Sequence, residues 1–278
     1  MASFRHRATR ILPFLKRGAI GTLCVALFMV LTQDLQVFPS LIPPLVGANP
    51  GTPPANVAES FVITSDNVRI RVWEMAAEGE ERSIALVLHG NADSLPNMAN
   101  LQALLAKNGI SSFSFDYRGS GGSDGWPTEQ GIYLDGEAVM DALLSKKGTT
   151  PSRVGILGIS VGTGPASYLA QRYKAGRLVL VSPYFSIRDL VAEMPLYGLL
   201  VPFFKYRFPT AEYLAQANET QISIFHGAKD TTIPFSHAER IAKHLAPGIR
   251  FELIRIDSAG HNDMLAVSHQ EIVARLAP

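Results

Sequence analysis

Short apolar runs alternate with longer amphipathic segments from about residue 57 to the end of the chain. The short runs have the length of strands, whereas the longer segments repeat apolar positions with the spacing of a helix. The predicted strands cover residues 61–64, 68–75, 84–88, 112–115, 154–157, 178–181, 222–225 and 251–256. The predicted helices cover residues 95–107, 129–144, 161–173, 235–245 and 264–276.

This alternation predicts an α/β fold with a mostly parallel, eight-stranded sheet and helices on both faces. The run at 84–88 is apolar throughout, as expected of a strand that is covered on both sides. Residues 183–220 interrupt the rhythm and contain no clear strand. Such a length is uncommon for a bare loop in a compact domain, so we interpret it as a lid insertion.

The N-terminal part of the chain follows a different pattern. Residues 1–17 form a basic tail without acidic residues, and residues 18–32 carry no charge. A basic stretch followed by an apolar run is typical of a signal peptide or a membrane anchor. Fifteen helical residues span about 22 Å, less than the ~30 Å hydrocarbon core, but Lys16, Arg17 and the mostly apolar residues 35–42 can extend the span.

No A-x-A cleavage site follows the apolar run closely, so we favour a transmembrane anchor at 18–38 over a cleaved signal peptide or a peripheral helix. The positive-inside rule then places the N-terminus in the cytoplasm and the folded domain on the far side of the membrane, periplasmic, lumenal or extracellular. A cleaved signal would give a secreted protein instead. Residues 39–56 are rich in proline and predict a stiff linker before a catalytic domain at 57–278.

The overall charge and the single cysteine exclude some classes. The formal net charge is +1, and because the basic tail carries several positive charges, the rest of the chain is mildly acidic. This balance argues against nucleic acid as a partner. Cys24 stands alone, so the chain forms no internal disulfide.

Residues 158–162 read Gly-Ile-Ser-Val-Gly and lie between a predicted strand and a predicted helix. In that position, flanking glycines allow a tight turn that brings the serine out above the sheet, at the positive end of the helix. The five-residue match alone is weak, because a serine can also merely cap a helix. With both elements in place, Ser160 is predicted to be a catalytic nucleophile.

A serine nucleophile needs a base and an acid, which follow it in the chain order Ser, Asp or Glu, His on this kind of sheet. Asp230 lies in the loop after the predicted strand 222–225, and His261 follows the strand 251–256. Both loops lie at the carboxyl edge of the sheet, so we expect His261 to accept the serine proton and Asp230 to orient the imidazole. Asp189 and Asp257 are the alternatives for the acid.

The remaining histidines have structural interpretations. His226 and His89 end strands and are expected to make structural hydrogen bonds, whereas His237 and His244 lie on a helix and are expected to be exposed. An oxyanion hole is predicted at the backbone N–H groups of Val161 and of Asn91, in the loop after the third strand, with Ala92 as a near alternative.

No cofactor or metal is predicted, because the chain has no HExxH, cysteine cluster or Walker loop. The glycine-rich segment 119–125 lacks the GK[ST] ending and is interpreted as a structural loop.

Five motifs in order resemble the α/β-hydrolase superfamily: HGNA at 89–92, DYRGSGGSDGWPTE at 116–129, GISVGTGPA at 158–166, HGAKDTTIP at 226–234 and AGHND at 259–263. The resemblance covers residues 57–277 and is strongest to a membrane-anchored subgroup that includes lysophospholipases, depalmitoylases and proteins classed near serine aminopeptidases. It implies a triad of Ser160, Asp230 and His261, and oxyanion donors at Asn91 and Val161.

The predicted lid suggests the kind of substrate. Residues 194–208 are rich in apolar and aromatic side chains, with only Lys205 and Arg207 charged. Such an insertion is expected to line an apolar pocket or to face a membrane, unless it simply packs on the domain. We therefore expect a serine hydrolase that cleaves an ester or thioester with a hydrophobic acyl group, such as a lysophospholipid, through an acyl-enzyme. A serine peptidase and a catalytically inactive membrane-tethered binding protein are the alternatives.

Overall fold

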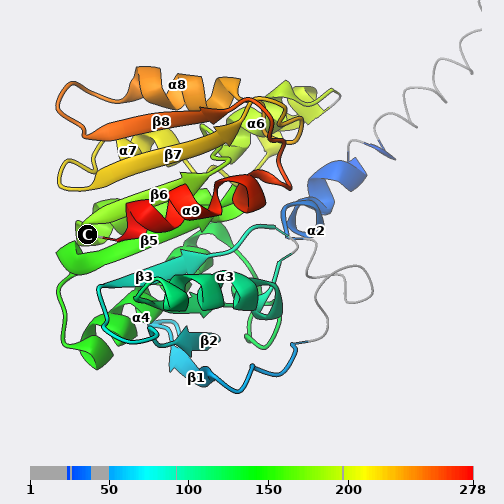
Figure 1. The fold of residues 1–278 in the computed structure, drawn as a ribbon. Helices are drawn as coiled ribbons and strands as arrows, with labels where there is room; N and C mark the ends of the chain where they lie inside the picture. The colour runs from blue at the N-terminus through cyan, green and yellow to red at the C-terminus, as the bar shows by residue number, and fades with distance from the viewer. Residues whose placement is uncertain (1–23, 26, 39–49, 92, 196, 278) are drawn as a thin grey trace, which may run out of the picture.

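A sheet with the strand order β1-β2-β4-β3-β5-β6-β7-β8 runs through the part of the chain that the structure describes (Figure 1). The structure is a computed structural model that describes residues 24, 25, 27–38, 50–91, 93–195 and 197–277. Pairs β1–β2 and β2–β4 are antiparallel, and every later pair is parallel. The strands are β1 (Val57–Ile63), β2 (Arg69–Met75), β3 (Ser83–Leu88), β4 (Ile110–Phe115), β5 (Val154–Ile159), β6 (Arg177–Val181), β7 (Gln221–Gly227) and β8 (Phe251–Ile256).

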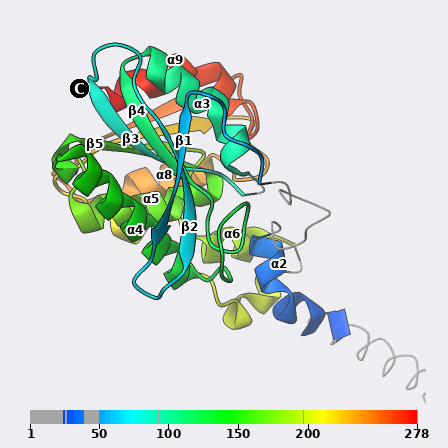
Figure 2. The same ribbon diagram turned by 90° about the horizontal axis from the view of Figure 1, so that it is seen from below.

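Helices cover both faces of this sheet. On one face lie α3 (Leu95–Lys107) and α9 (Met264–Leu276), and on the other lie α4 (Glu129–Lys147), α5 (Thr163–Tyr173) and α8 (Ser236–His244) (Figure 2). The side chains of β3 alternate between the two cores: Leu86 and Leu88 pack with α4 and α5, whereas Val87 packs with α3. The predicted α/β class and mostly parallel sheet are confirmed.

Some helices and strands begin and end where the hydrophobic pattern predicts, and others do not. Helices α3 and α9 have the predicted limits. Strand β1 instead begins at Val57, before the predicted residue 61. It is an edge strand that pairs only with β2, and most of its side chains are exposed, so its first residues lack the alternation that identifies a half-buried strand.

The segment between β6 and β7, which we call the insertion (residues 183–220), contains three short helical elements. These are α6 (Ile187–Glu193), η4 (Tyr197–Phe203) and α7 (Thr210–Leu214). No strand occurs in its described residues, 183–195 and 197–220, as the sequence pattern predicted. The Ser186 hydroxyl accepts the N–H of Asp189 at 2.9 Å and so caps the start of α6.

The end of the N-terminal segment contacts the domain. Residues 18–23 and 26 of the predicted anchor lie outside the described residues, and none of the helices that the structure does describe combines the length and apolar character needed to cross a membrane. Helix α2 (Gln33–Val37) lies within the predicted anchor at 18–38, but it packs beside the insertion and so does not extend a membrane span (Figure 1). Residues 39–49 of the predicted linker are also outside the described ranges, but the Gly51 carbonyl beyond them accepts the Arg71 Nη2 at 2.9 Å. Both flanks of residues 39–49 therefore contact the domain.

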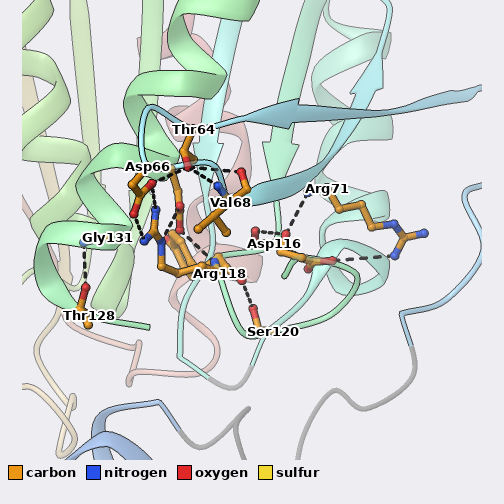
Figure 3. Close-up of polar contacts among 12 residues, drawn as sticks. Thr64, Asp66, Val68, Arg71, Asp116, Arg118, Ser120, Thr128 and Gly131 are labelled. Atoms are coloured by element: carbon orange, nitrogen blue, oxygen red, sulfur yellow. Dashed lines mark hydrogen bonds and ion pairs between the residues drawn. The ribbon is translucent and has the colours of Figure 1, made fainter. Parts of the chain in front are cut away.

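Two buried carboxylates organise the loop that follows β4 (Figure 3). Asp116 accepts the N–H groups of Leu95, at 2.9 Å, and of Gly122, at 3.1 Å. It therefore joins the start of α3 to the glycine-rich loop and fixes one end of the loop that follows β3. One amide of residues 119–125, the Gly122 N–H, thus bonds to the protein's own carboxylate, in keeping with a structural role for this segment.

Arg118 is the cation of this loop. Its Nη1 donates to Asp66 at 2.7 Å (Figure 3). Its Nε donates to buried Asp135 at 2.8 Å. Burial raises the pKa of Asp135 to about 6, although its bonds to Arg118 oppose this. The more exposed Asp66 has its pKa lowered to about 2, mainly by the hydrogen bonds from Arg118. One guanidinium therefore holds the β1–β2 turn, α4 and the loop after β4 together.

Candidate active site

Ser160 lies at the turn where β5 passes into α5. It is the first residue of the short helix η3 (Ser160–Gly162), and its φ of 50° is unusual for a residue with a side chain. The flanking glycines leave no room for a Cβ. One at Gly162 would lie 2.5 Å from the Leu88 carbonyl oxygen, and one at Gly158 would lie 2.6 Å from the Cβ of Ala166. The serine is therefore presented by a turn that only glycines at both flanks can form.

The three residues predicted as a triad are joined by hydrogen bonds. Ser160 Oγ lies 3.0 Å from His261 Nε2, and His261 Nδ1 lies 2.7 Å from Asp230 Oδ2. When Nδ1 donates its hydrogen to the carboxylate, Nε2 is left as the acceptor for the serine hydroxyl. This arrangement can transfer a proton from the serine to the histidine while the histidine ring stays in place.

The Asp230 carboxylate is itself fixed. Its Oδ1 accepts the N–H groups of Thr232, at 2.9 Å, and of Ile233, at 2.8 Å. Burial raises the pKa of Asp230, but the hydrogen bonds from His261 and Ile233 outweigh that effect and leave the pKa below its ordinary value. Asp230 is therefore a charged acceptor at neutral pH, oriented toward the imidazole.

Neighbouring parallel strands bring these side chains to one edge of the sheet. Ser160 follows β5, Asp230 follows β7 and His261 follows β8, and these strands belong to the parallel part of the sheet. Carboxyl ends of parallel strands share one edge, which is where ligands bind in open α/β sheets. The structure thus places all three predicted residues together.

The predicted oxyanion donors lie at the same place. Asn91 and Val161 line one cavity together with Ser160 and His261. The loop after β3 lies directly against the serine, because a Cβ built on Gly90 would be 3.5 Å from the Cβ of Ser160. The alternative donor, Ala92, lies outside the described residues. The roles of the Asn91 and Val161 N–H groups stay predictions.

The alternative acids have other partners. The Asp189 carboxylate, in the first turn of α6, accepts the Ser186 hydroxyl and forms an ion pair with Arg240. Asp257 accepts Arg255 Nε at 2.7 Å, with its side chain 85 % exposed. Neither residue lines the cavity that contains Ser160, so Asp230 is the acid that the geometry favours.

The expectation that His237 is exposed is wrong. Its side chain is fully buried, and its Nδ1 accepts the Phe185 N–H at 3.1 Å. The insertion starts over this face of α8, and a helical pattern alone does not reveal what covers a polar position. His244, on the same helix, is exposed as expected.

The two strand-end histidines make structural contacts. His226 Nε2 lies 2.8 Å from the carbonyl of Ile233, and burial lowers the pKa of His226, so the ring is neutral and donates this bond. His89 Nδ1 lies 2.8 Å from the Gly90 carbonyl. The two rings thus brace the loops that carry Asp230 and Asn91.

A cavity of about 440 Å³ opens beside Ser160 and His261, within the size range of small-molecule sites. The insertion supplies much of its apolar lining, namely Ile187, Leu190, Val191, Met194, Tyr197 and Phe204. Gln36 and Val37 of α2 also line it, which the sequence did not predict. Within the described ranges, no group of three or more His, Cys, Asp or Glu residues is arranged to hold a metal ion.

Comparison with known proteins identifies the family of the chain. Residues 79–223 match the family model described as serine aminopeptidase, S33. An uncharacterised protein of Mycobacterium tuberculosis is 31% identical over 207 residues, which cover 73% of this chain and 71% of that protein. Human alpha/beta hydrolase domain-containing protein 17B is 32% identical over 213 residues, 72% of this chain and 68% of that protein.

Solved structures show the same fold. An alpha-beta hydrolase from Vibrio vulnificus superposes with a TM-score of 0.67 at 23% identity, over 80% of this chain and 82% of that chain. The esterase Pf2001 of Pyrococcus furiosus gives 0.63 at 23% identity, over 79% and 89%. The chain therefore belongs to the α/β-hydrolase superfamily of serine hydrolases, in the family described as serine aminopeptidase, S33.

Proposed function

We propose that this hydrolase is a serine esterase or thioesterase for substrates with a hydrophobic acyl group. The observation that carries the proposal is the hydrogen-bonded chain Ser160–His261–Asp230, which opens onto a largely apolar cavity. A nucleophile, its base and the group that orients the base are thereby present in contact, as acyl transfer requires.

The reaction follows from these positions. Ser160 Oγ attacks the substrate carbonyl carbon as its proton passes to His261 Nε2, and the N–H groups of Val161 and Asn91 hold the resulting oxyanion. The bond to the leaving alcohol or thiol then breaks, and the leaving group takes the proton from His261. Water, deprotonated by His261, attacks the acyl-serine and releases the carboxylic acid and free Ser160.

The cavity lining favours an acyl ester over an aminopeptidase substrate. None of the described residues that line the cavity is Asp, Glu, Lys or Arg. An aminopeptidase must bind the ammonium group of its substrate, and burying that charge without a carboxylate partner is costly. An apolar chain meets no such cost, so a peptidase remains the second candidate on the family description alone, and a long-chain ester or lysophospholipid fits the lining better.

Fluorophosphonate labelling tests the nucleophile. The wild type is expected to be labelled covalently, and Ser160→Ala is expected to lose the label completely, because Ser160 is the serine whose Oγ lies against His261 Nε2. Ser182→Ala is a matched control, since Ser182 is buried at the end of β6 and also has a positive φ, of 51°. Equal labelling of wild type and Ser160→Ala would contradict the assignment.

Exchange of the two candidate acids separates their roles. Asp230→Asn is expected to lower kcat for a p-nitrophenyl ester by about 10³- to 10⁴-fold, because an amide cannot hold the imidazole in the right tautomer. Asp189→Asn is expected to keep kcat within about 3-fold, since its partners are Ser186 and Arg240 and not the base. The reverse ranking of the two variants would make Asp189 the acid.

Substrate preference tests the apolar cavity. The wild type is expected to have a kcat/KM for p-nitrophenyl decanoate at least about 10-fold above that for the acetate, because each buried CH₂ contributes up to ~0.8 kcal/mol. Leucine p-nitroanilide is expected to be a poorer substrate than either ester. A preference for acetate would exclude a long acyl pocket, and a preference for the anilide would favour the peptidase.

We also propose that the N-terminal segment attaches the enzyme to a membrane. The basic residues 1–17 and the uncharged residues 18–32 support this. So do the large apolar side chains that remain exposed in two adjoining places: Leu27, Phe28 and Leu31 before α2, and Leu199 and Phe203 on the insertion. Leu199 is 83 % exposed, and surfaces of this kind mark interaction sites in soluble domains.

Carbonate extraction of cells that express the full chain checks the attachment. The intact protein is expected to stay with the membrane pellet, and protease added from the far side is expected to reach the catalytic domain. Recovery of the intact chain in the soluble fraction would contradict an anchor. A shortened soluble protein would instead support the cleaved signal peptide.

A further inference from the structure

Helix α2 precedes the predicted catalytic domain, yet it touches the site. We propose that α2 is a specificity element of the enzyme: Gln36 and Val37 form one wall of the acyl cavity, and their size determines which acyl chains fit. This inference rests on the proposed function, because it assigns the acyl group of that reaction to the cavity beside Ser160. It concerns residues outside the region that the family model matches, 79–223.

A buried glutamine fixes the position of α2 on the insertion. Gln33 is only 4 % exposed. Its Nε2 donates to the carbonyl of Phe203 at 3.0 Å, and its Oε1 accepts the N–H of Lys205 at 2.9 Å. The Gln33 side-chain amide therefore bonds to the backbone of the insertion both as a donor and as an acceptor. A shift of α2 along the insertion would break both bonds at once and leave buried polar groups unpaired.

Asp34 adds a charged contact to two further elements. Its carboxylate pairs with Lys205 and accepts the Tyr206 hydroxyl, and Trp126 Nε1 donates to it at 3.2 Å. Burial raises the pKa of Asp34. The hydrogen bonds from Lys205, Tyr206 and Trp126 lower it by more, so the pKa is below its ordinary value. Asp34 is therefore ionised at neutral pH and links α2 to the insertion and to the segment before α4.

An aromatic contact completes the docking. Phe38, directly after α2, is 6 % exposed and belongs to the main core cluster. Its ring meets Tyr206 edge-on with 5.3 Å between centroids, and Phe208 with 6.4 Å. Edge-to-face pairs at these distances add roughly 0.5–1.5 kcal/mol each to the burial of the ring. With Gln33 and Phe38 both buried, the residues between them are held in one orientation.

That orientation directs Gln36 and Val37 into the cavity that contains Ser160 and His261. The insertion supplies Val191 and Phe204 to the same cavity. A small adjoining hollow continues between α2 and the insertion, and it shares Gln36, Val191 and Phe204 with the catalytic cavity. Because Val37 and Gln36 share this cavity with Ser160, an acyl chain bound there would contact their side chains, which would then limit its length and width.

Substitution of Val37 in the full-length protein tests the wall. Val37→Trp is expected to lower kcat/KM for p-nitrophenyl decanoate by at least about 10-fold while the acetate changes less than about 3-fold, because an added ring fills the space of a long chain. Val37→Ala is expected to shift the preference toward longer chains. Leu31→Trp and Leu31→Ala are the matched controls for hydrolysis and binding by the detergent-solubilised protein, since Leu31 lies before α2, is 72 % exposed and lines neither hollow. Both controls are expected to match the wild type.

Binding of cis-parinaric acid, followed by its fluorescence, separates this inference from the proposed function. Weaker binding by Val37→Trp, with Leu31→Trp unchanged, supports the wall even if no ester is hydrolysed, in which case only the proposed function fails. Unchanged ester profiles and unchanged binding in both Val37 variants would overturn the inference, as would equal shifts in the Leu31 controls. Should Val37→Trp lose fluorophosphonate labelling through misfolding, Val37→Ala decides alone.

Discussion

The close approach of β5, β3 and α5 at the serine turn is the constraint on which the site depends. The Leu88 carbonyl oxygen would lie 2.5 Å from any Cβ at Gly162, so the end of β3 and the start of α5 are in direct backbone contact. This contact forces Ser160 into a positive φ and brings the loop after β3 against it. A side chain at Gly162 would push the end of β3 away from the serine turn. The loop that carries the predicted donor Asn91 would then move away from Ser160.

The charges around the site are few, and each has a defined partner. Asp230 is held by two backbone N–H groups and by His261, and His226 Nε2 lies 3.5 Å from the same carboxylate, so the protein itself supplies every partner of this charge that we describe. The cavity beyond it is lined by uncharged side chains among the described residues. The polar catalytic groups therefore lie at the sheet edge, whereas α6 and α2 contribute mostly apolar side chains to the cavity. An ester with a long acyl chain has a polar carbonyl group and an apolar tail, which match these two parts of the cavity.

The sheet, the principal helices and the meeting of Ser160, Asp230 and His261 could be predicted from the sequence because they depend on short local patterns and on the order of the strands. Apolar periodicity defines α3 and α9, and the order of parallel strands brings their carboxyl ends to one edge. Features that depend on distant partners were missed. His237 is buried by the insertion, and Gln33 bonds to Lys205 across 172 positions, so no local pattern could show either contact. Most β1 side chains are exposed, so this strand lacks the alternation of buried and exposed positions that would identify it.

The docking of α2 joins the N-terminal segment to the shape of the cavity. A helix of five residues is not stable alone, so α2 depends on the insertion, and the insertion, which has no strand in its described residues, depends in turn on Gln33, Asp34 and Phe38 for part of its packing. The segment that we propose to reach the membrane is continuous with this helix. A force or a lipid contact that displaced α2 would therefore also move Gln36 and Val37, and the cavity beside Ser160 would change its width without any change in the catalytic residues.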